Sequence, residues 1–274
     1  KKIKKIIIVQ NKIDLVSKEQ ALANYKTIKE FVKGTIAENS PIIPVSAIQG
    51  VNLDKILKEL CKIEISKPNE KETPLFLIAR SFDINKPGTS LKNLHGGVLG
   101  GALKQGTLKI GDTIEIKPGY SYKKNNVYHY KTVKSKIISM QKGKYPISQA
   151  TPGGSLAIET ELDPALTKAD ALSGSIASKE KILPEITENI KIKYTLFEEV
   201  FGTGKHETVD KPKPNEILML SLNTSITVGQ VSKTYENAVD LTLKIPVVPL
   251  KGESIGIARN LNGHWRLIGF GEII

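Results

Sequence analysis

Three polar residues follow directly on an apolar segment near the start of the sequence. Asn11, Lys12 and Asp14 come after the β-branched run at positions 6–9. A carboxylate accepts two hydrogen bonds from a planar pair of donors, and the ring N–H and amino group of guanine form such a pair. We therefore expect Asp14 to read a guanine edge. Asn11 would bridge a base acceptor and nearby backbone, and the Lys12 alkyl stem would cover the ring face.

A second polar turn, Ser46-Ala47-Ile48, follows the next apolar segment at positions 41–45. If both segments are strands of a parallel sheet, their carboxyl ends meet at one edge, where ligands bind in such sheets. A backbone N–H of this turn would then meet guanine O6. The alternative is that Asn11 to Asp14 form an ordinary turn, because Asn and Asp favour turns. The two strands and the helix between them favour base recognition.

The elements that must position these side chains alternate between strand and helix. Ser17 and Gln20 have the spacing of a capping box and predict a helix start. The pattern strand, helix, strand, helix predicts a parallel α/β sheet over the first 64 residues. The apolar positions expected on helix faces are Leu22, Tyr25, Ile28, Phe31 and Val32 in the first helix, and Leu53, Ile56, Leu57 and Leu60 in the second.

The sequence changes character after a polar, Pro-flanked linker at positions 66–74. Beyond it, short apolar runs alternate with Gly, Pro, Asn and Asp turns, which is typical of antiparallel barrels. A break at Leu183-Pro184 separates two such sets. The predicted fold class is therefore multidomain, with an α/β parallel sheet followed by two antiparallel β-barrels. The predicted domains are 1–72, including the linker, 73–183 and 184–274.

Composition limits the function classes. The net charge is +12, and the excess of basic residues is largest in the middle domain. This favours a polyanionic partner such as nucleic acid, although biased codons would also enrich lysine. No apolar run approaches the roughly 20 residues of a membrane span. The single cysteine, Cys61, is expected in a helix-face core, and it excludes an internal disulfide and a cysteine-based zinc site. With a single cysteine, the cytoplasm is the expected compartment. The four histidines lack ligand spacing, so we expect no metal site.

Several motifs resemble known families. Asn11-Lys12-Ile13-Asp14 and Ser46-Ala47 match the base-recognition motifs of translational GTPases, and positions 96–119 resemble the second domain of elongation-factor-Tu-like proteins. Further segments resemble the gamma-subunit family of eukaryotic and archaeal translation initiation factor two. They lie at positions 81–88, 95–101, 151–160, 214–220 and 264–273.

The resemblance implies a GTP-binding domain followed by two barrels, and GTP-dependent delivery of initiator methionyl-tRNA to the small ribosomal subunit. It implies GTP or GDP as ligand, with Mg²⁺ in the intact protein. The implied partners are the alpha and beta subunits of the same factor, GTPase-activating factors and nucleotide-exchange factors. No binding to a membrane is expected. It also makes Gly96, Gly97, Gly100 and Gly101 candidates for tRNA contact. Glycines inside a strand pattern otherwise mark a bulge or a close backbone approach.

One motif of a GTPase is missing from this sequence. The phosphate-binding pattern G-x-x-x-x-G-K-[ST] does not occur, and the chain has no initiator Met. We therefore interpret the chain as the C-terminal part of a GTPase. The intact protein would convert GTP to GDP and phosphate, whereas this chain alone, with no catalytic residue, should not. Two alternatives remain: another Tu-like carrier of the selenocysteine-specific type, or, if the chain is complete, a nucleotide-independent scaffold that binds RNA or protein.

Overall fold

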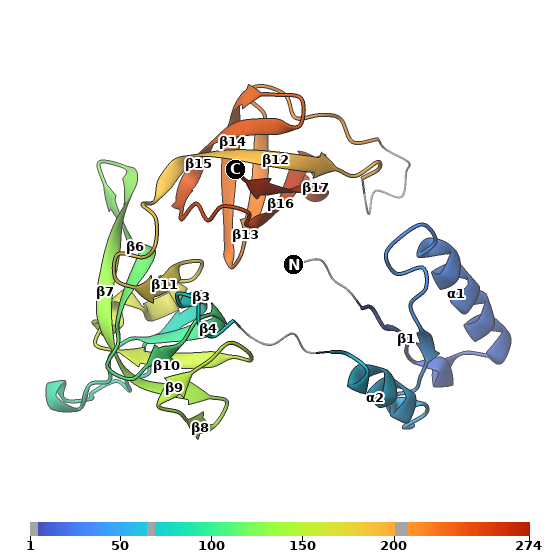
Figure 1. Ribbon diagram of the computed structural model, residues 1–274, viewed down its shortest axis with the longest axis horizontal. Coiled ribbons are helices and arrows are strands. Elements are labelled where there is room, and N and C mark those ends of the chain that lie inside the picture. The colour runs from blue at the N-terminus through green and yellow to red at the C-terminus, as the bar shows by residue number, and fades with distance from the viewer. Residues whose placement is uncertain (1–4, 65–68, 201–207) are drawn as a thin grey trace. The chain divides into compact units, whose positions relative to one another are not determined.

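The computed structural model describes residues 5–64, 69–200 and 208–274. The chain divides into two compact units, Lys1–Lys67 and Pro68–Ile274 (Figure 1). Part of the predicted linker, positions 66–68, lies outside the described residues. No helix in the described part of the chain is long and apolar enough to cross a membrane.

The first unit contains the predicted parallel sheet. Strand β1 (Ile8–Gln10) pairs in parallel with β2 (Ile42–Pro44). Between them come a short 3-10 helix, η1 (Ile13–Leu15), and the helix α1 (Lys18–Phe31), and α2 (Leu53–Cys61) follows β2. The strand, helix, strand, helix order is therefore confirmed, and both strands run toward the same edge.

The capping box at the start of α1 is confirmed. The backbone N–H of Gln20 donates to Ser17 Oγ at 3.3 Å, and the Ser17 N–H donates to Gln20 Oε1 at 3.0 Å. These two bonds satisfy donors that a helix start leaves without intrahelical partners. The capping box therefore fixes the start of α1 directly after η1.

The expected burial of the helix faces is wrong for most positions in the first unit: Val32 is buried and Tyr25, Ile28 and Ile56 are half-buried, but the other five are exposed. Phe31 is 76% exposed and Leu57 is 61% exposed, and Leu22, Leu53 and Leu60 are exposed as well. Cys61, expected in a core, is also exposed. The physical reason is the size of the sheet: two strands of three residues offer little apolar surface to cover two helices. Among the described residues of this unit, the buried apolar ones are Val32, Ile43 and Val45.

The second unit begins with a ring of six strands. Their order is β10-β4-β3-β11-β6-β7, and pairing of β10 with β7 closes the ring, with β8 added beside β7. The strands are β3 (Leu75–Phe82), β4 (Val98–Gln105), β6 (Thr113–Lys124), β7 (Val127–Lys142), β10 (Leu156–Thr160) and β11 (Ile176–Lys179). The shorter elements are β5 (Leu108–Lys109), β8 (Tyr145–Pro146), β9 (Gln149–Ala150), η2 (Leu91–Asn93), η3 (Pro164–Leu166) and η4 (Lys168–Asp170).

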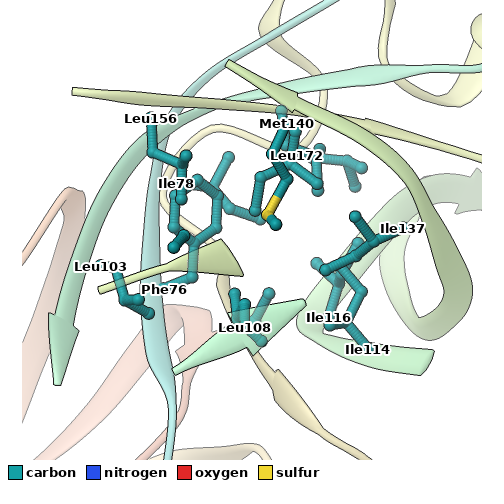
Figure 2. Packing of buried hydrophobic residues seen from close by; sticks show 14 of the residues in the cluster. Phe76, Ile78, Leu103, Leu108, Ile114, Ile116, Ile137, Met140, Leu156 and Leu172 are labelled. Atoms are coloured by element: carbon teal, nitrogen blue, oxygen red, sulfur yellow. The ribbon is translucent and has the colours of Figure 1, made fainter. Parts of the chain in front are cut away.

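Inward-facing apolar side chains fill this first barrel. Figure 2 shows Phe76 and Ile78 of β3 among the side chains that pack in this core with Ile116 of β6 and Met140 of β7. Phe76, Ile78 and Ile116 are fully buried. Side chains of a strand alternate between faces, so apolar residues at every second position suffice to build such a core.

The remaining strands form a second closed barrel in the order β12-β15-β14-β13-β16-β17. Their bounds are β12 (Thr187–Leu196), β13 (Ile217–Leu222), β14 (Ser225–Thr234), β15 (Ala238–Val247), β16 (Ser254–Leu261) and β17 (His264–Ile273). Alternation is clear in β12, where Ile190 and Ile192 are buried in the core and Lys193 is exposed. Two antiparallel barrels after a parallel sheet are thus confirmed.

Candidate functional site

The side chain of Asn11 joins the ends of the two parallel strands. Its Oδ1 accepts hydrogen bonds from the backbone N–H of Lys12 at 2.8 Å and of Ala47 at 3.2 Å. Ala47 follows β2, so the bond crosses from one strand end to the other. The two turns that the sequence analysis singled out therefore lie together at one edge of the sheet.

A left-handed residue turns the chain at this edge. Lys12 has φ 66° and ψ 33°, and the N–H of Ile13 donates to Val45 O at 3.2 Å. The chain then enters η1, in which Asp14 is exposed. Few residues other than Gly, Asn and Asp adopt this backbone region readily, so a lysine there is costly unless the surrounding bonds hold it. The turn leaves both Lys12 and Asp14 open to solvent.

The second turn is held from inside. Ser46 is fully buried; its Oγ accepts from the Gln49 N–H at 3.2 Å, and its backbone pairs with Val51. Asn52 supports the same turn by donating Nδ2–H to Pro44 O at 2.7 Å. Ile48 lies at the tip and is 87% exposed. Ser46 thus stabilises the turn from its buried side, whereas Ala47 and Ile48 are exposed to solvent.

These contacts decide which atoms remain for a ligand. The Ala47 N–H is used by Asn11, whereas the Ile48 N–H has no hydrogen bond within the described residues and can donate to a carbonyl. Both bonds of Asn11 use its oxygen, which leaves its NH₂ group for a base acceptor. With the exposed Asp14 carboxylate, the edge carries donors and acceptors suited to a planar polar ring.

The candidate glycines of the second unit lie in and before β4, and three of them have a packing reason. A Cβ at Gly96 would collide with Thr160 O, one at Gly97 with the Thr167 side chain, and one at Gly101 with Leu77 O. Gly100 differs, since its Cβ would lie 3.1 Å from Phe82 Cζ, a contact that a small side-chain shift relieves. The close backbone approach expected of such glycines is therefore present.

Charged side chains surround this strand. Arg80 donates Nε–H to both Asp170 oxygens at 2.9 and 3.0 Å, and the Ser81 N–H adds a bond at 3.0 Å. Arg80 is the β3 residue opposite Gly100. The Arg80 guanidinium lowers the pKa of Asp170, and the bond from Ser81 adds to this effect. The ion pair fixes the arginine stem and leaves its outer nitrogens at the surface.

A second pair lies at the start of β4. His95 Nδ1 is 2.8 Å from Glu159 Oε1, and Ser139 Oγ donates to Glu159 Oε2 at 2.7 Å. Asn85 fixes the His95 backbone by two bonds, both 2.8 Å, to its N–H and C=O. The hydrogen bonds of Arg80 and His95 were not predicted from the sequence. They join residues 10 to 90 positions apart, and no local pattern indicates such pairs.

Comparison with known proteins identifies the family. The model for the C-terminal domain of initiation factor eIF2 gamma matches residues 188–273. A curated relative from Methanococcus maripaludis, "Translation initiation factor 2 subunit gamma", is 48% identical over 99% of this chain and 67% of its own length. The protein of the same name from Pyrococcus furiosus is 44% identical over 98% of this chain and 66% of its own length. The chain belongs to the translation initiation factor 2 gamma-subunit family.

Membership in the gamma-subunit family makes the chain part of a translation initiation factor. It spans about two thirds of the length of these relatives. The resemblance to the gamma-subunit family, inferred from the motifs, is therefore confirmed. The two alternatives, a selenocysteine-specific carrier and a nucleotide-independent scaffold, have less support.

Solved structures agree on the fold. The bacterial selenocysteine-specific elongation factor EF-Sec has a TM-score of 0.75 at 21% identity, over 99% of this chain and 40% of its own. Methanococcus maripaludis SelB, in complex with the GTP analogue GppNHp, has a TM-score of 0.73 at 19% identity, over 98% of this chain and 58% of its own. At these identities the likeness concerns the fold alone, whereas the relatives of the gamma-subunit family are more than 40% identical.

Proposed function

We propose that the intact protein is the GTP-binding gamma subunit of initiation factor 2 and delivers initiator methionyl-tRNA to the small ribosomal subunit. Family membership supports the role in initiation. The observation that carries nucleotide binding is the Asn11 side chain, which joins the two strand ends at 2.8 and 3.2 Å. SelB, of similar fold, is described in complex with a GTP analogue.

In this proposal residues 1–72 are the C-terminal half of a GTP-binding domain with its linker, and residues 73–183 and 184–274 are the two barrel domains. The exposed apolar faces of α1 and α2 support the first assignment, because a larger sheet would cover them. The guanine base is held by Asn11, Lys12, Asp14, Ser46, Ala47 and Ile48.

The geometry favours a specific division of labour around the base. The Asp14 carboxylate accepts from the guanine ring N–H and amino group, and the Asn11 NH₂ group donates to an acceptor on the opposite edge. The Ile48 N–H donates to O6, because the Ala47 N–H is already bonded to Asn11. Ser46 acts indirectly by shaping the turn. Adenine offers no donor pair to Asp14, so it is excluded.

The described residues fit the base but not the phosphates or Mg²⁺. The sequence lacks the phosphate-binding pattern, and no group of three metal-ligating side chains occurs among the described residues. Conversion of GTP to GDP and phosphate therefore belongs to the intact protein. Incubation of the 274-residue chain with GTP should release no phosphate above the rate in buffer.

The barrels are proposed to meet the other partners. Gly96, Gly97, Gly100 and Gly101 are the candidate tRNA contacts; Gly97 is buried and the other three are half-buried. The word "subunit" in the relatives' names supports assembly with alpha and beta subunits. We also propose GTPase-activating and nucleotide-exchange factors as partners of the intact protein. Its proposed location is the cytoplasm.

The base assignment has a direct test in the intact protein. Asp14→Asn exchanges an acceptor for a donor, so the site should lose guanine and gain xanthine nucleotides. We expect the guanine preference, on the order of 10⁴ for a site built on such a polar edge, to invert. Equilibrium titration with fluorescent GDP and XDP measures this change.

The matched control is Asp54→Asn, which removes the same charge from the exposed first turn of α2. It should leave both affinities unchanged. Equal guanine affinity in Asp14→Asn and in the unmodified protein would refute the assignment.

A further inference from the structure

The residue at the start of α2 does not make the contact that its position predicts. Asn52 is the N-cap of this helix, and its backbone C=O accepts from the N–H groups of Lys55 at 3.2 Å and Ile56 at 3.4 Å. An asparagine at this position ordinarily caps its helix, because its side-chain oxygen accepts from a backbone N–H of the first turn. The Asn52 side chain makes no such bond. Its hydrogen-bonding groups therefore serve a different contact.

That contact lies at the end of β2. Asn52 Nδ2 donates to Pro44 O at 2.7 Å, across eight positions of the chain. Pro44 is the last residue of β2 and the register partner of Gln10, the last residue of β1. The start of α2 is thus bonded to the strand end from which the turn at Ser46-Ala47-Ile48 begins.

The bond from Asn52 closes the loop that contains this turn. Inside the loop, the backbones of Ser46 and Val51 exchange two hydrogen bonds of 3.0 and 3.3 Å, and Ser46 Oγ accepts from the Gln49 N–H at 3.2 Å. These inner bonds fix the shape of the tip. The bond from Asn52 instead ties the far end of the loop to β2.

Two attachments therefore hold the loop to the two strand ends. Asn11, which follows β1, accepts from the Ala47 N–H at 3.2 Å, and Asn52 donates to Pro44 of β2. The Ile48 N–H, which we propose as the donor to guanine O6, lies between Ala47 and Asn52 in the chain. An N–H···O bond forms over a narrow range of about 2.7–3.2 Å, so a small shift of the loop weakens a bond to O6.

We propose that Asn52 is a positioning residue for the O6 side of the guanine base. This inference rests on the proposed function and adds to it a residue that does not touch the base. Asn52 holds the loop so that the Ile48 N–H meets O6. Asp14, which reads the ring N–H and the amino group, lies in η1, outside this loop. The two sides of the base are thus positioned separately, and Asn52 acts on one of them.

The residue type at position 52 fits this role. Asn52 has φ 58° and ψ 19°, a left-handed conformation that glycine, asparagine and aspartate adopt most readily. Of these three, asparagine is the one whose side chain supplies an N–H donor for the Pro44 carbonyl. Asn52→Gly keeps the backbone conformation and removes the donor, so the variant should fold. Asn52→Asp keeps the side-chain shape but turns a carboxylate oxygen toward the carbonyl oxygen.

Three nucleotides measure the two sides of the base separately in the intact protein. Compared with GDP, 6-thio-GDP replaces O6 by sulfur, a weaker acceptor, and IDP lacks the amino group from which Asp14 accepts. The ratio of the Kd of 6-thio-GDP to that of GDP therefore reports the contact with Ile48. The ratio of the Kd of IDP to that of GDP reports the contact with Asp14. Competition against fluorescent GDP gives all three constants.

The variants of Asn52 should change one ratio and not the other. Asn52→Gly should weaken GDP binding about fivefold, the typical contribution of one hydrogen bond, and lower the 6-thio-GDP ratio by the same factor. The IDP ratio should stay the same, because IDP and GDP both carry O6. Asn52→Asp should lower the 6-thio-GDP ratio at least as far. Loss of folded protein alone would weaken all three nucleotides equally, so an unchanged 6-thio-GDP ratio in both variants overturns the proposal.

Two control variants should leave both ratios unchanged. Asn262→Gly makes the same substitution at another left-handed residue, φ 52°, in the turn between β16 and β17. Thr35→Ala loosens the first unit elsewhere, because Thr35 Oγ1 donates to Val32 O at 2.7 Å between α1 and β2. A fall of the 6-thio-GDP ratio in either control would overturn the specific role of Asn52.

The outcomes separate this inference from the proposed function. An unmodified protein that binds the three nucleotides equally would refute base recognition itself. An unmodified protein that discriminates against 6-thio-GDP, with the same discrimination in Asn52→Gly, would refute the role of Asn52 alone. Asparagine and aspartate cap helices about equally well. Full GDP affinity in Asn52→Asp would therefore assign Asn52 to the helix start and overturn the positioning role.

Discussion

Glu159 illustrates how single residues hold the outer surface of the first barrel. Partial burial opposes its ionisation, but bonds from Ser139 and His95 outweigh that effect and bring the pKa of Glu159 below its ordinary 4.5. A carboxyl group with a lowered pKa in the folded protein stabilises the fold fully above its unfolded pKa. The stabilisation disappears as the pH falls through the lower folded pKa.

This linkage gives a pH-dependent prediction for Glu159→Gln. Above about pH 4.5 the variant should be less stable by about 1–3 kcal/mol, because bonds to a charged group are lost. Below that pH the difference should shrink toward zero. Denaturant unfolding of both proteins across this range measures it, with Glu161→Gln as the control at an exposed neighbouring position. A difference that grows on acidification would contradict the assignment.

At the scale of elements, local signals were predictable and long-range ones were not. The Ser17 capping box and the parallel pairing of the first two strands follow from short motifs and alternation. The meeting of Asn11 with Ala47 follows from strand direction. By contrast, Arg80 and Asp170 are 90 positions apart in the sequence and come into contact only when the barrel closes. No sequence motif predicts such a contact. The helix faces were misjudged because periodicity shows which side is apolar, not what covers it.

The β4 glycines give a prediction at this scale. Gly101→Ala should destabilise the first barrel by about 1–3 kcal/mol, because its Cβ would meet the backbone oxygen of Leu77. Gly100→Ala should change stability little, because the Phe82 ring can move aside. If this face contacts tRNA, Gly100→Ala should still weaken retention of methionyl-tRNA by the GTP-bound intact protein. Thermal unfolding measures the effect on stability, and filter binding measures the retention of methionyl-tRNA. Equal melting temperatures for Gly100→Ala and Gly101→Ala would contradict the packing argument.

At the scale of the whole molecule, the two units differ in how much apolar surface they bury. Each barrel encloses its own cluster of buried side chains, whereas the described part of the first unit buries three apolar residues. Buried apolar area is the main favourable term in folding. The barrels should therefore carry most of the stability of the chain.

Truncation tests this distribution. A protein of residues 69–274 should fold alone and unfold at the same temperature as the main calorimetric transition of the full chain. The first unit should account for an earlier and smaller transition that disappears on truncation. A main transition lowered by more than a few degrees in the shorter protein would show that the first unit contributes to barrel stability.

Ring closure also has a consequence for solution behaviour. In both barrels the strands of the ring pair on each side, so their backbone groups offer no template to a neighbouring molecule. Within the described residues the β1–β2 sheet is open at both sides, and four of its six residues are β-branched, including the exposed Val9. Self-association of this chain at high concentration would therefore begin at the small sheet, and charged substitutions there would improve its solubility more than changes to either barrel.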